Sequence, residues 1–477
     1  MPLVPGSPVP PRNASDASSS SDAAGHSERH ILAISDPATG EPVGTVMVAD
    51  EDAVRDAVGR VSAAGPRWAR TPLEERAVVL RRWARSLEEH AGELALLLTR
   101  ETGALLNDAH GQVDAAVEAI ERYAVLGPLQ RDRRPVDGET IERAPRGVVA
   151  VLLPWRDPVA LGCAQLAACL VTGNTVVVKP SGRAPLSVER AVRLLAAPTD
   201  VVALVHGGAR TGDCLVTDLD VGMVLHTGSV ETGRAIAASC STRLNAAVTE
   251  RGGKGAVVVD RGVDPEAAAI HAAAAAFSHA GQLCGSVDRL LVHRTVHDRF
   301  LGALLSRAER LRSGSGVERS STLAPLVDAR QRAAVHGQVM AAIAGGAQLL
   351  TGGTLPPGPG CFYPPTVLGG VNPSMAVWSQ KSLGPIAAIK PFDDFDAALG
   401  SAADGGLRGA VTVLTTDADR AGRASREFDF GTVDPRAFPA GTSGIAIEWL
   451  RQPGTGMGYG PELLDELTRW RVARRPA

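Results

Sequence analysis

Lysine and aromatic residues are scarce in this chain of 477 residues. Only four of its 49 basic residues are lysines, at positions 179, 254, 381 and 390, and aromatic residues make up 4% of the sequence. The basic residues are almost balanced by 52 acidic ones, so the formal net charge is −3. A chain with so little net charge offers no basic surface for nucleic acid or for an anionic membrane, and we expect neither as a partner. The preference for arginine and alanine is typical of a high-GC bacterial gene.

Disulfide and metal motifs are also missing. The chain has no CxxC pair and no Cys/His grouping at the spacing of zinc ligands. Its six cysteines are widely scattered: Cys163, Cys169, Cys214, Cys240, Cys284 and Cys361. This pattern predicts no disulfide framework and no metal site. It favours reduced thiols and a cytoplasmic location.

No segment has the character of a signal peptide or a membrane span. Residues 1–30 are rich in proline, serine and aspartate and have no apolar core, so we expect a disordered N-terminal extension. Residues 158–178 carry no charge, but polar residues and a Gly-Asn pair interrupt them. The interruption predicts a helix, a turn and a short strand instead of a membrane-spanning helix.

Hydrophobic spacing predicts an α/β fold. Apolar residues recur at helical spacing in three segments, 51–63, 73–99 and about 110–125. The polar stretch 130–144 has a central Asp-Gly, which indicates a β-hairpin. From residue 147 onward apolar strands and helices alternate, and the series occurs once before and once after about residue 250. Alternation of this kind predicts two open, parallel sheets with helices on both faces.

Two residues are candidates for covalent chemistry. Cys284 lies in FSHAGQLCGS, where small neighbours leave the sulfur accessible to a substrate carbon, as a nucleophile requires. The alternative is an ordinary packed cysteine. Glu250 lies between an apolar strand and a Gly-Gly loop, where a carboxylate with a raised pKa can act as a general base. The alternative is an ordinary charge at the end of a strand.

Two further segments are candidates for binding a phosphate-bearing ligand. HTGSVETGR (226–234) follows a strand and opens a helix, so Gly228 permits close approach and Ser229 can cap the helix beside a phosphate. The segment lacks the GxGxxG fingerprint and also reads as a plain helix cap. Lys179 follows a strand at the edge where ligands bind in parallel sheets, although a solvated strand end is equally compatible.

Together, the order and spacing of these segments resemble the aldehyde dehydrogenase superfamily from about residue 31 to 472. The shared segments are WARTPLEERAVVLRRWA (68–84), GVVAVLLPW (147–155), GNTVVVKPS (173–181), HTGSVETGR (226–234), ERGGK (250–254), GQLCG (281–285), GCFYPPTVL (360–368) and LGPI (383–386). The resemblance implies two open α/β domains and an oligomerisation β-hairpin. A variant Rossmann domain for NADP or NAD comprises residues 31–125 and 147–249, the catalytic domain 250–430, and the oligomerisation segment 126–146 and 431–470.

The resemblance also implies a mechanism and site residues. Cys284 attacks a small aldehyde, hydride transfer to the cofactor leaves a thioester, and Glu250 activates the water that hydrolyses it. Trp155 lines the cofactor cleft, Lys179 binds the adenosine ribose and Ser229 faces the pyrophosphate. The full set of implied cofactor-binding positions is Trp155, Lys179, Ser181, Gly182, Gly228, Ser229, Gly233, Gly252 and Lys381. A homodimer or homotetramer is the implied assembly.

The chain departs from the family pattern around the implied reaction centre. Arg156 replaces the asparagine that donates to the developing oxyanion. We expect this longer, cationic donor to take the catalytic role there, and the alternative is that it pairs with Asp157 instead of reaching the substrate. Lys381 replaces a glutamate that binds the nicotinamide ribose, although a lysine cannot accept hydrogen bonds. The alternatives are that Lys381 meets a phosphate or an acidic substrate, or that it disorders the nicotinamide end. Arg251 adds a charge beside this site. Gly182-Arg183 replaces an acidic residue that disfavours a 2′-phosphate, which tilts the cofactor toward NADP or toward no discrimination.

Two hypotheses follow from the retained and the altered residues. The first is an active NAD(P)-dependent aldehyde dehydrogenase, which the retention of Cys284 and Glu250 favours. The second is a catalytically impaired homologue that acts as a binding or scaffold subunit, which Arg156, Arg251 and Lys381 favour. The arginines also suit an acidic aldehyde such as a semialdehyde.

Overall fold

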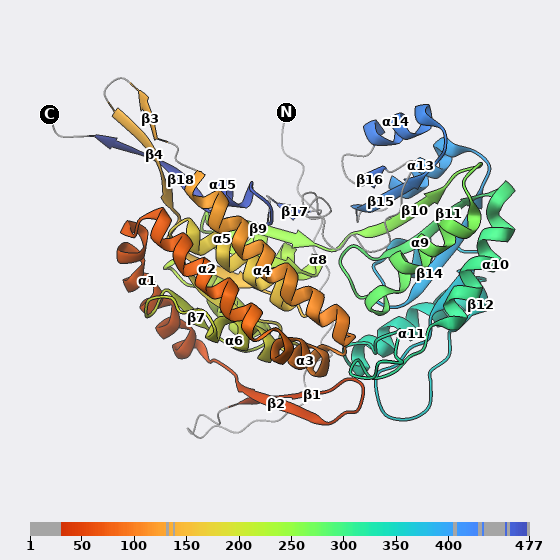
Figure 1. Cartoon of the computed structure of the whole chain (residues 1–477), viewed down its shortest axis with the longest axis horizontal. Helices are drawn as coiled ribbons and strands as arrows, with labels where there is room; N and C mark the ends of the chain where they lie inside the picture. Colours follow the sequence, from red (N-terminus) through yellow and green to blue (C-terminus); the bar gives the residue numbers. More distant parts are fainter. Residues whose placement is uncertain are drawn as a thin grey trace, which may run out of the picture.

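The computed structural model describes residues 30–129, 133–136, 139–403, 408–427, 432–433, 454–455 and 458–474. Residues 1–29 of the predicted N-terminal extension lie outside this part. The described chain forms two lobes side by side, each built on its own sheet, and a three-stranded sheet projects from the first lobe (Figure 1). No helix in the described ranges has the length and apolar content needed to cross a membrane.

The first lobe contains a six-stranded sheet in the order β17-β9-β8-β5-β6-β7. Its strands are β17 (Gly454–Thr455), β9 (Ala246–Arg251), β8 (Val221–Gly228), β5 (Val148–Leu152), β6 (Thr175–Lys179) and β7 (Val202–Leu204). They run parallel except for β17, which is antiparallel to β9. All five residues of β5 are buried, as expected for a strand whose two faces are both covered by helices.

Helices cover both faces of this sheet. They are α1 (Glu51–Arg70), α2 (Leu73–Glu89), α3 (Ala91–Thr102), α4 (Leu106–Leu129), α5 (Pro158–Val171), α6 (Leu186–Arg193), α7 (Ala209–Thr217) and α8 (Val230–Ser241). Alternate residues of β5 belong to different cores: Val149 packs in the core with α2, α4 and α5, whereas Ala150 packs with α1, α7 and α8. The single helix predicted over 73–99 is divided at His90, whose φ of −108° is not helical.

The second lobe contains a seven-stranded sheet in the order β12-β13-β14-β11-β10-β15-β16. Its strands are β12 (Gln348–Thr351), β13 (Thr366–Gly369), β14 (Ile386–Phe392), β11 (Val287–His293), β10 (Lys254–Val259), β15 (Arg408–Leu414) and β16 (Thr432–Val433). Its helices are α9 (Pro265–Phe277), the 3₁₀ turn η1 (Ser278–Gly281), α10 (Arg294–Arg310), α11 (Ala329–Ala344), α12 (Ala376–Ser379), α13 (Phe395–Ala403) and α14 (Ala418–Glu427). The predicted α/β fold with two open sheets is therefore confirmed.

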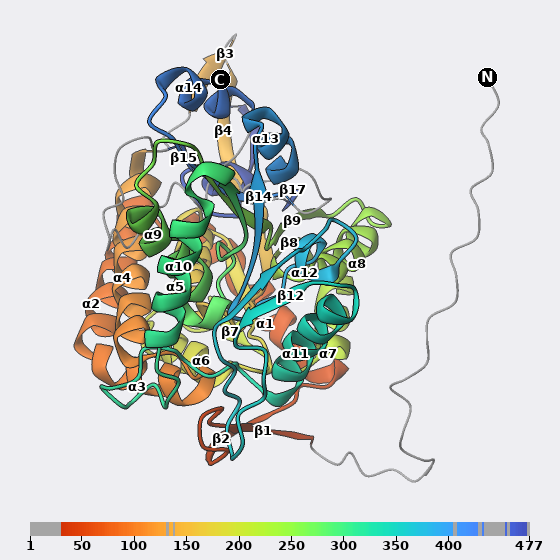
Figure 2. The ribbon, with the colours of Figure 1, turned by 90° about the vertical axis from the view of Figure 1, so that its right-hand side faces the viewer.

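Two antiparallel elements complete the described chain. β1 (Ile31–Ser35) pairs with β2 (Pro42–Met47), and β3 (Arg133–Val136) pairs with β4 (Glu139–Pro145), where the polar stretch predicts a hairpin. β18 (Thr468–Arg474), which follows α15 (Leu463–Glu466), extends the second hairpin to three strands. Both views place the β1–β2 hairpin at the end of the molecule opposite β3–β4 (Figures 1 and 2).

The segment predicted for oligomerisation, 431–470, is distributed among three parts of the fold. β16 continues the sheet of the second lobe, β17 adds to the sheet of the first lobe, and residues 468–470 begin β18. Residues 434–453 lie outside the described part of the chain. The domain boundaries and the assembly predicted from the sequence therefore stay predictions.

The change from one sheet to the other occurs within a few residues. β9 ends at Arg251 and β10 begins at Lys254, so only Gly252 and Gly253 connect the two sheets. The structure therefore changes sheets close to residue 250, where the sequence pattern suggests that the second series begins. Residues on either side of this connection lie at the junction of the two lobes, and Glu250 is among them.

Gly281, the last residue of η1, is required by the local packing. Its φ is +69°, and a Cβ atom there would lie 2.1 Å from the carbonyl oxygen of Gly384. We expect Gly281→Ala to destabilise the protein by about 1–3 kcal/mol, because the left-handed conformation is strained and the backbone must shift. Gly337→Ala is the control, since it is exposed in α11 with nothing within 4 Å. Urea unfolding that ranks the two variants equally would contradict the packing argument.

Candidate active site

Cys284 lies on the loop between η1 and β11. It is a free thiol and is 6% exposed. The chain turns sharply within η1, just before this loop, because His279 and Ala280 have φ values of 50° and 54°, which few residues other than glycine adopt. These bends end α9 at Phe277 and leave Cys284 at the entrance to β11.

Gln282 fixes this loop to the neighbouring chain. Its Nε2 donates to the carbonyl oxygen of Pro325 at 3.2 Å, and its Oε1 accepts from the amide of Val327 at 2.9 Å. Both contacts are buried, and both bind a segment more than 40 residues away in the sequence. The sequence gives no indication of a role for Gln282, although this residue is part of the GQLCG motif. The structure shows that it holds the loop two residues before Cys284.

Glu250 is buried near the end of β9. It is 2% exposed, and its Oε1 accepts a hydrogen bond from the amide of Gly458 at 2.7 Å. Its Oε2 has no hydrogen-bond partner within the described residues. Burial raises the pKa of Glu250 to about 8, and the Gly458 amide opposes the rise. A Cβ atom on Gly458 would lie 2.7 Å from the carboxyl group, so glycine is needed there.

A hydrogen-bonded group that the sequence analysis did not identify lies next to Glu250. The hydroxyl groups of Tyr459 and Thr227 are 2.7 Å apart, and Gln165 donates to Thr227 at 3.2 Å. Burial raises the pKa of Tyr459, and both Glu250 and Cys284 raise it further. Tyr459 is therefore within electrostatic range of the candidate base and the candidate nucleophile. The signal was missed because residues 458–460 lie more than 170 positions from Cys284.

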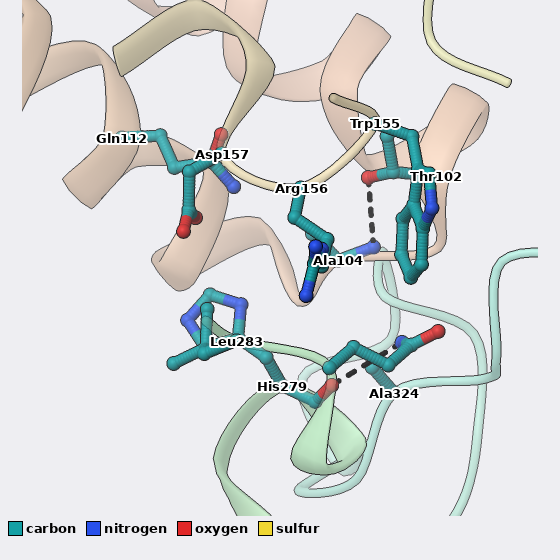
Figure 3. Close-up of a pocket in the computed structure, with 10 residues that line it drawn as sticks. Thr102, Ala104, Gln112, Trp155, Arg156, Asp157, His279, Leu283 and Ala324 are labelled. Carbon is teal, nitrogen blue, oxygen red and sulfur yellow. Dashed lines mark hydrogen bonds between the residues drawn. The ribbon is translucent and has the colours of Figure 1, made fainter. Parts of the chain in front are cut away.

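Arg156 is buried without a partner. It is 7% exposed, it forms no hydrogen bond or ion pair within the described part of the chain, and its Nε and Nη1 atoms are inaccessible to solvent. In particular, it does not pair with its neighbour Asp157, which has a φ of 45° at the start of α5. Figure 3 shows its guanidinium pointing from the loop after β5 toward the segment that carries His279 and Leu283. Arg156 therefore places an uncompensated positive charge in a pocket beside the Cys284 loop.

Lys381 belongs to a buried charge cluster, which we call the Lys-Asp-Lys cluster: Lys254, Asp288 and Lys381. The ammonium groups of Lys254 and Lys381 lie 2.9 Å and 3.8 Å from Oδ2 of Asp288. Lys381 also donates to the carbonyl oxygen of Ser286. Burial lowers the pKa of both lysines, that of Lys254 to about 8, and Asp288 opposes the shift. The position of the family's glutamate thus holds a cation that already has two acceptors.

The residues predicted for the adenosine and pyrophosphate end fit a dinucleotide. Nζ of Lys179 donates to the carbonyl oxygens of Pro180 and Gly207 at 3.1 and 3.2 Å. It has no acidic partner within the described residues, and burial lowers its pKa to about 8. Ser229 caps α8 by accepting from the amide of Thr232 at 3.1 Å. The remaining amides of this helix end and the Lys179 ammonium are donors suited to phosphate and ribose oxygens.

The predicted glycines lie close to other groups of the site. A Cβ atom on Gly228 would lie 2.5 Å from the ring of His226, one on Gly182 3.1 Å from Leu32, and one on Gly252 3.7 Å from Nη1 of Arg156. Gly233 is buried in the first turn of α8. At Gly228 the packing therefore leaves no space for a side chain.

Arg183, the basis of the preference for NADP, is already paired. Its Nε lies 2.7 Å from Oδ2 of Asp328, which caps α11 in the second lobe. Its guanidinium lies 5.7 Å from the ring centroid of Trp155. The hydroxyl of Ser181 accepts from the Arg183 amide at 3.3 Å. An arginine with this partner gives little support for a 2′-phosphate site. The side chain of Arg251 lies outside the described part of the structure.

Comparisons with known proteins identify the class that this fold and site define. Residues 24–473 match the model of the aldehyde dehydrogenase family. The 3,6-anhydro-α-L-galactose dehydrogenase of Streptomyces coelicolor is 34% identical over 458 residues, 93% of this chain and 92% of that protein. The chain therefore belongs to the aldehyde dehydrogenase family, and the resemblance inferred from its motifs is confirmed.

Solved structures agree with this assignment. An NAD-dependent aldehyde dehydrogenase from Sinorhizobium meliloti has a TM-score of 0.88 at 27% identity and covers 94% of this chain and 92% of its own. An NADP-dependent enzyme of E. coli has a TM-score of 0.86 at 27% identity, and the match covers 93% of this chain and 94% of the E. coli chain. Structures similar to this chain thus include users of either cofactor, and the prediction of NAD or NADP is confirmed at that level.

The Lys-Asp-Lys cluster gives a stability prediction. We expect Lys381→Glu to destabilise the protein by about 3–5 kcal/mol, because two buried carboxylates would then share the single ammonium of Lys254. Combining it with Asp288→Asn restores one cation and one anion, so the double variant is expected to recover part of the loss. Lys390→Glu, on β14, is the control. Thermal unfolding in which Lys381→Glu melts no lower than Lys390→Glu would contradict a paired cluster.

Proposed function

We propose that the protein oxidises an aldehyde to a carboxylic acid with NAD or NADP through a thioester on Cys284. The observation that carries the proposal is the buried carboxylate of Glu250, whose Oε2 has no hydrogen-bond partner within the described residues. The chain also keeps the free thiol of Cys284 in the second lobe. We keep cytoplasmic location and a homodimer or homotetramer as expectations of family membership.

The first half of the reaction uses Cys284 and Arg156. The thiolate of Cys284 attacks the aldehyde carbon, so that an S–C bond forms and the carbonyl oxygen becomes an oxyanion. Arg156 supplies N–H groups at the position of the family's oxyanion donor, and its Nε and Nη1 have no acceptor within the described residues. NAD(P), when bound, provides the acceptor for the hydride that the thiohemiacetal carbon loses.

The second half of the reaction uses Glu250. Its free Oε2 can accept a proton from water as the water oxygen attacks the thioester carbon. The C–S bond then breaks, the carboxylic acid leaves and the Cys284 thiol is restored. Gly458 holds Oε1, so one carboxylate oxygen is anchored while the other remains available. Lys179, Ser229 and the first turn of α8 hold the cofactor in this proposal, with Trp155, Ser181, Gly182, Gly228, Gly233 and Gly252 around it.

Lys381 bears on the alternative of an impaired homologue. Its ammonium is held by Ser286 and Asp288, so it offers the nicotinamide ribose no acceptor. This favours weaker binding at the nicotinamide end. However, a lysine paired with a buried aspartate is a compensated substitution, which supports an altered site over a decayed one.

Two variants test the active-enzyme proposal. We expect Cys284→Ala to abolish formation of NADH or NADPH, measured by absorbance at 340 nm with a panel of aldehydes. Cys240→Ala, a buried cysteine on α8, is the matched control and is expected to retain turnover. Turnover that survives in Cys284→Ala, or the absence of turnover with every aldehyde in the wild type, would count against the proposal.

The pKa of Glu250 sets the pH dependence of deacylation. Only the deprotonated carboxylate can take a proton, so release of an acyl group from Cys284 is expected to rise with pH and level off above about 8. Below pH 7 it should fall about tenfold per unit. Glu250→Gln should remove this dependence and slow release by about 10²–10⁴-fold. The deacylation rate is measured by acylating Cys284 with p-nitrophenyl acetate and following the release of acetate by rapid quench at a series of pH values.

The control for this experiment is Glu309→Gln, an exposed glutamate on α10. It should keep the pH profile of the wild type. An unchanged profile in Glu250→Gln would show that another group activates the water.

A further inference from the structure

The pocket beside the Cys284 loop contains a cation, Arg156, that forms no ion pair with any residue of the described chain. Arg156 is more than nine-tenths buried, yet it forms neither an ion pair nor a hydrogen bond within the described residues. Burial of an unpaired charge is unfavourable because the charge loses water and gains no partner. Arginine cannot relieve this by losing its proton. The site therefore gains stability when an anion enters the pocket.

The surrounding charges strengthen the preference for an anion. Arg156 lowers the pKa of Lys381, so the two cations act on each other. The only ion-pair partner of Lys381 in the described residues is Asp288, which Lys254 shares. Two ammonium groups therefore share a single carboxylate, with a free guanidinium within electrostatic range. A neutral substrate would leave this excess of positive charge unchanged.

Asp157 is the acidic group closest to Arg156 in sequence, and it does not compensate for the charge. It lines the same pocket, but no ion pair joins it to Arg156 (Figure 3). Burial raises its pKa, while His279 and Arg156 oppose the rise and Asp108 adds to it. His279 lies 3.6 Å from Asp108, so that carboxylate is also engaged elsewhere. The positive charge of Arg156 thus remains available to a ligand.

The position of the pocket connects this charge to the reaction. Leu283 lines the pocket together with Arg156, and Cys284 is the next residue along the chain. Gln282 also lines it and is fixed by its contacts to Pro325 and Val327, which limits the freedom of the loop. A ligand that contacts Arg156 therefore lies beside the residue that precedes the nucleophile.

Resting on the proposed function, we propose that the substrate is a short oxo acid, an aldehyde whose own carboxylate binds the buried, unpartnered guanidinium of Arg156 while its carbonyl carbon meets Cys284. Charge-assisted hydrogen bonds between arginine and a carboxylate are stronger than those to a neutral oxygen. Nε and Nη1 of Arg156 have no acceptor within the described residues, so a carboxylate can be bound beside the oxyanion, since a guanidinium carries five N–H donors. Trp155, whose ring centroid is 5.7 Å from the guanidinium carbon, covers one side of it.

Paired substrates test this proposal. 4-Oxobutanoate and its methyl ester have the same aldehyde and nearly the same length, and differ in the negative charge. We expect wild-type kcat/KM to favour the acid by about 10- to 100-fold, the range of a hydrogen bond to a charged group. Arg156→Gln should reduce that ratio to near one. If Arg156 acts on the oxyanion alone, the variant will slow both substrates equally and leave the ratio unchanged, which overturns the proposal.

Arg183→Gln is the matched control. Arg183 lies at the same 5.7 Å distance from the Trp155 ring, but its charge is paired with Asp328. This variant should keep the preference for the acid. If Arg183→Gln removes the preference for the acid as fully as Arg156→Gln does, the selectivity comes from the combined positive charge of the region and not from contact with Arg156. That outcome would overturn the proposal.

A binding measurement separates this inference from the proposed function. Calorimetry of succinate with Cys284→Ala reports carboxylate binding without any turnover. Binding that is lost in Cys284→Ala/Arg156→Gln and kept in Cys284→Ala/Arg183→Gln supports the carboxylate site even where no aldehyde is oxidised. If the methyl ester is turned over as fast as 4-oxobutanoate and succinate does not bind, the proposed function is supported. The carboxylate-binding role of Arg156 is then overturned.

Discussion

The active site depends on one buried carboxylate that holds two lysines. Asp288 lies on β11, Lys254 begins β10, and Lys381 precedes β14, so the cluster joins three neighbouring strands of one sheet. Removing three charges from water is expensive, and only close pairing repays the cost. The loop of Cys284 enters β11 immediately before Asp288, and Lys381 also donates to Ser286 within that loop. The position of the nucleophile is thus coupled to the pairing of the cluster.

The same dependence on distant segments holds for the base. Glu250 comes from β9, but the amide that anchors it belongs to Gly458, and Tyr459 is held by Thr227 of β8. A segment near the C-terminus therefore completes a site whose other groups lie in residues 156–381. Since burial raises the pKa of Glu250, the packing that anchors the carboxyl also keeps it protonated until the pH approaches 8. Stability and reactivity of this group depend on the same desolvation.

The sequence predicts those features that depend on local patterns. Alternating apolar segments predict the two sheets, and the cap formed by Ser229 lies where the sequence places a helix start. The site is only partly predictable, because its partners are remote. Nothing near Cys284 in the sequence indicates Tyr459, and nothing near Lys381 indicates Asp288. The division of α2 from α3 at His90 was also missed, since the apolar spacing continues across the break while the backbone does not.

Two departures from the family pattern differ in their physical consequences. Lys381 has partners within the chain, because it shares the carboxylate of Asp288 with Lys254 and donates to the carbonyl oxygen of Ser286. Arg156 has no such partner, although it is buried to a similar degree. A substitution that leaves an unpaired charge in the interior is costly in the free protein, since the desolvation is not repaid. The cost is offset only in a state where an anion is present. The free protein therefore has a higher free energy than an anion complex, and that difference contributes to binding. Arg156 is therefore the residue through which the charge of a ligand would be coupled to the reaction centre, whereas Lys381 belongs to the charge cluster that surrounds this centre.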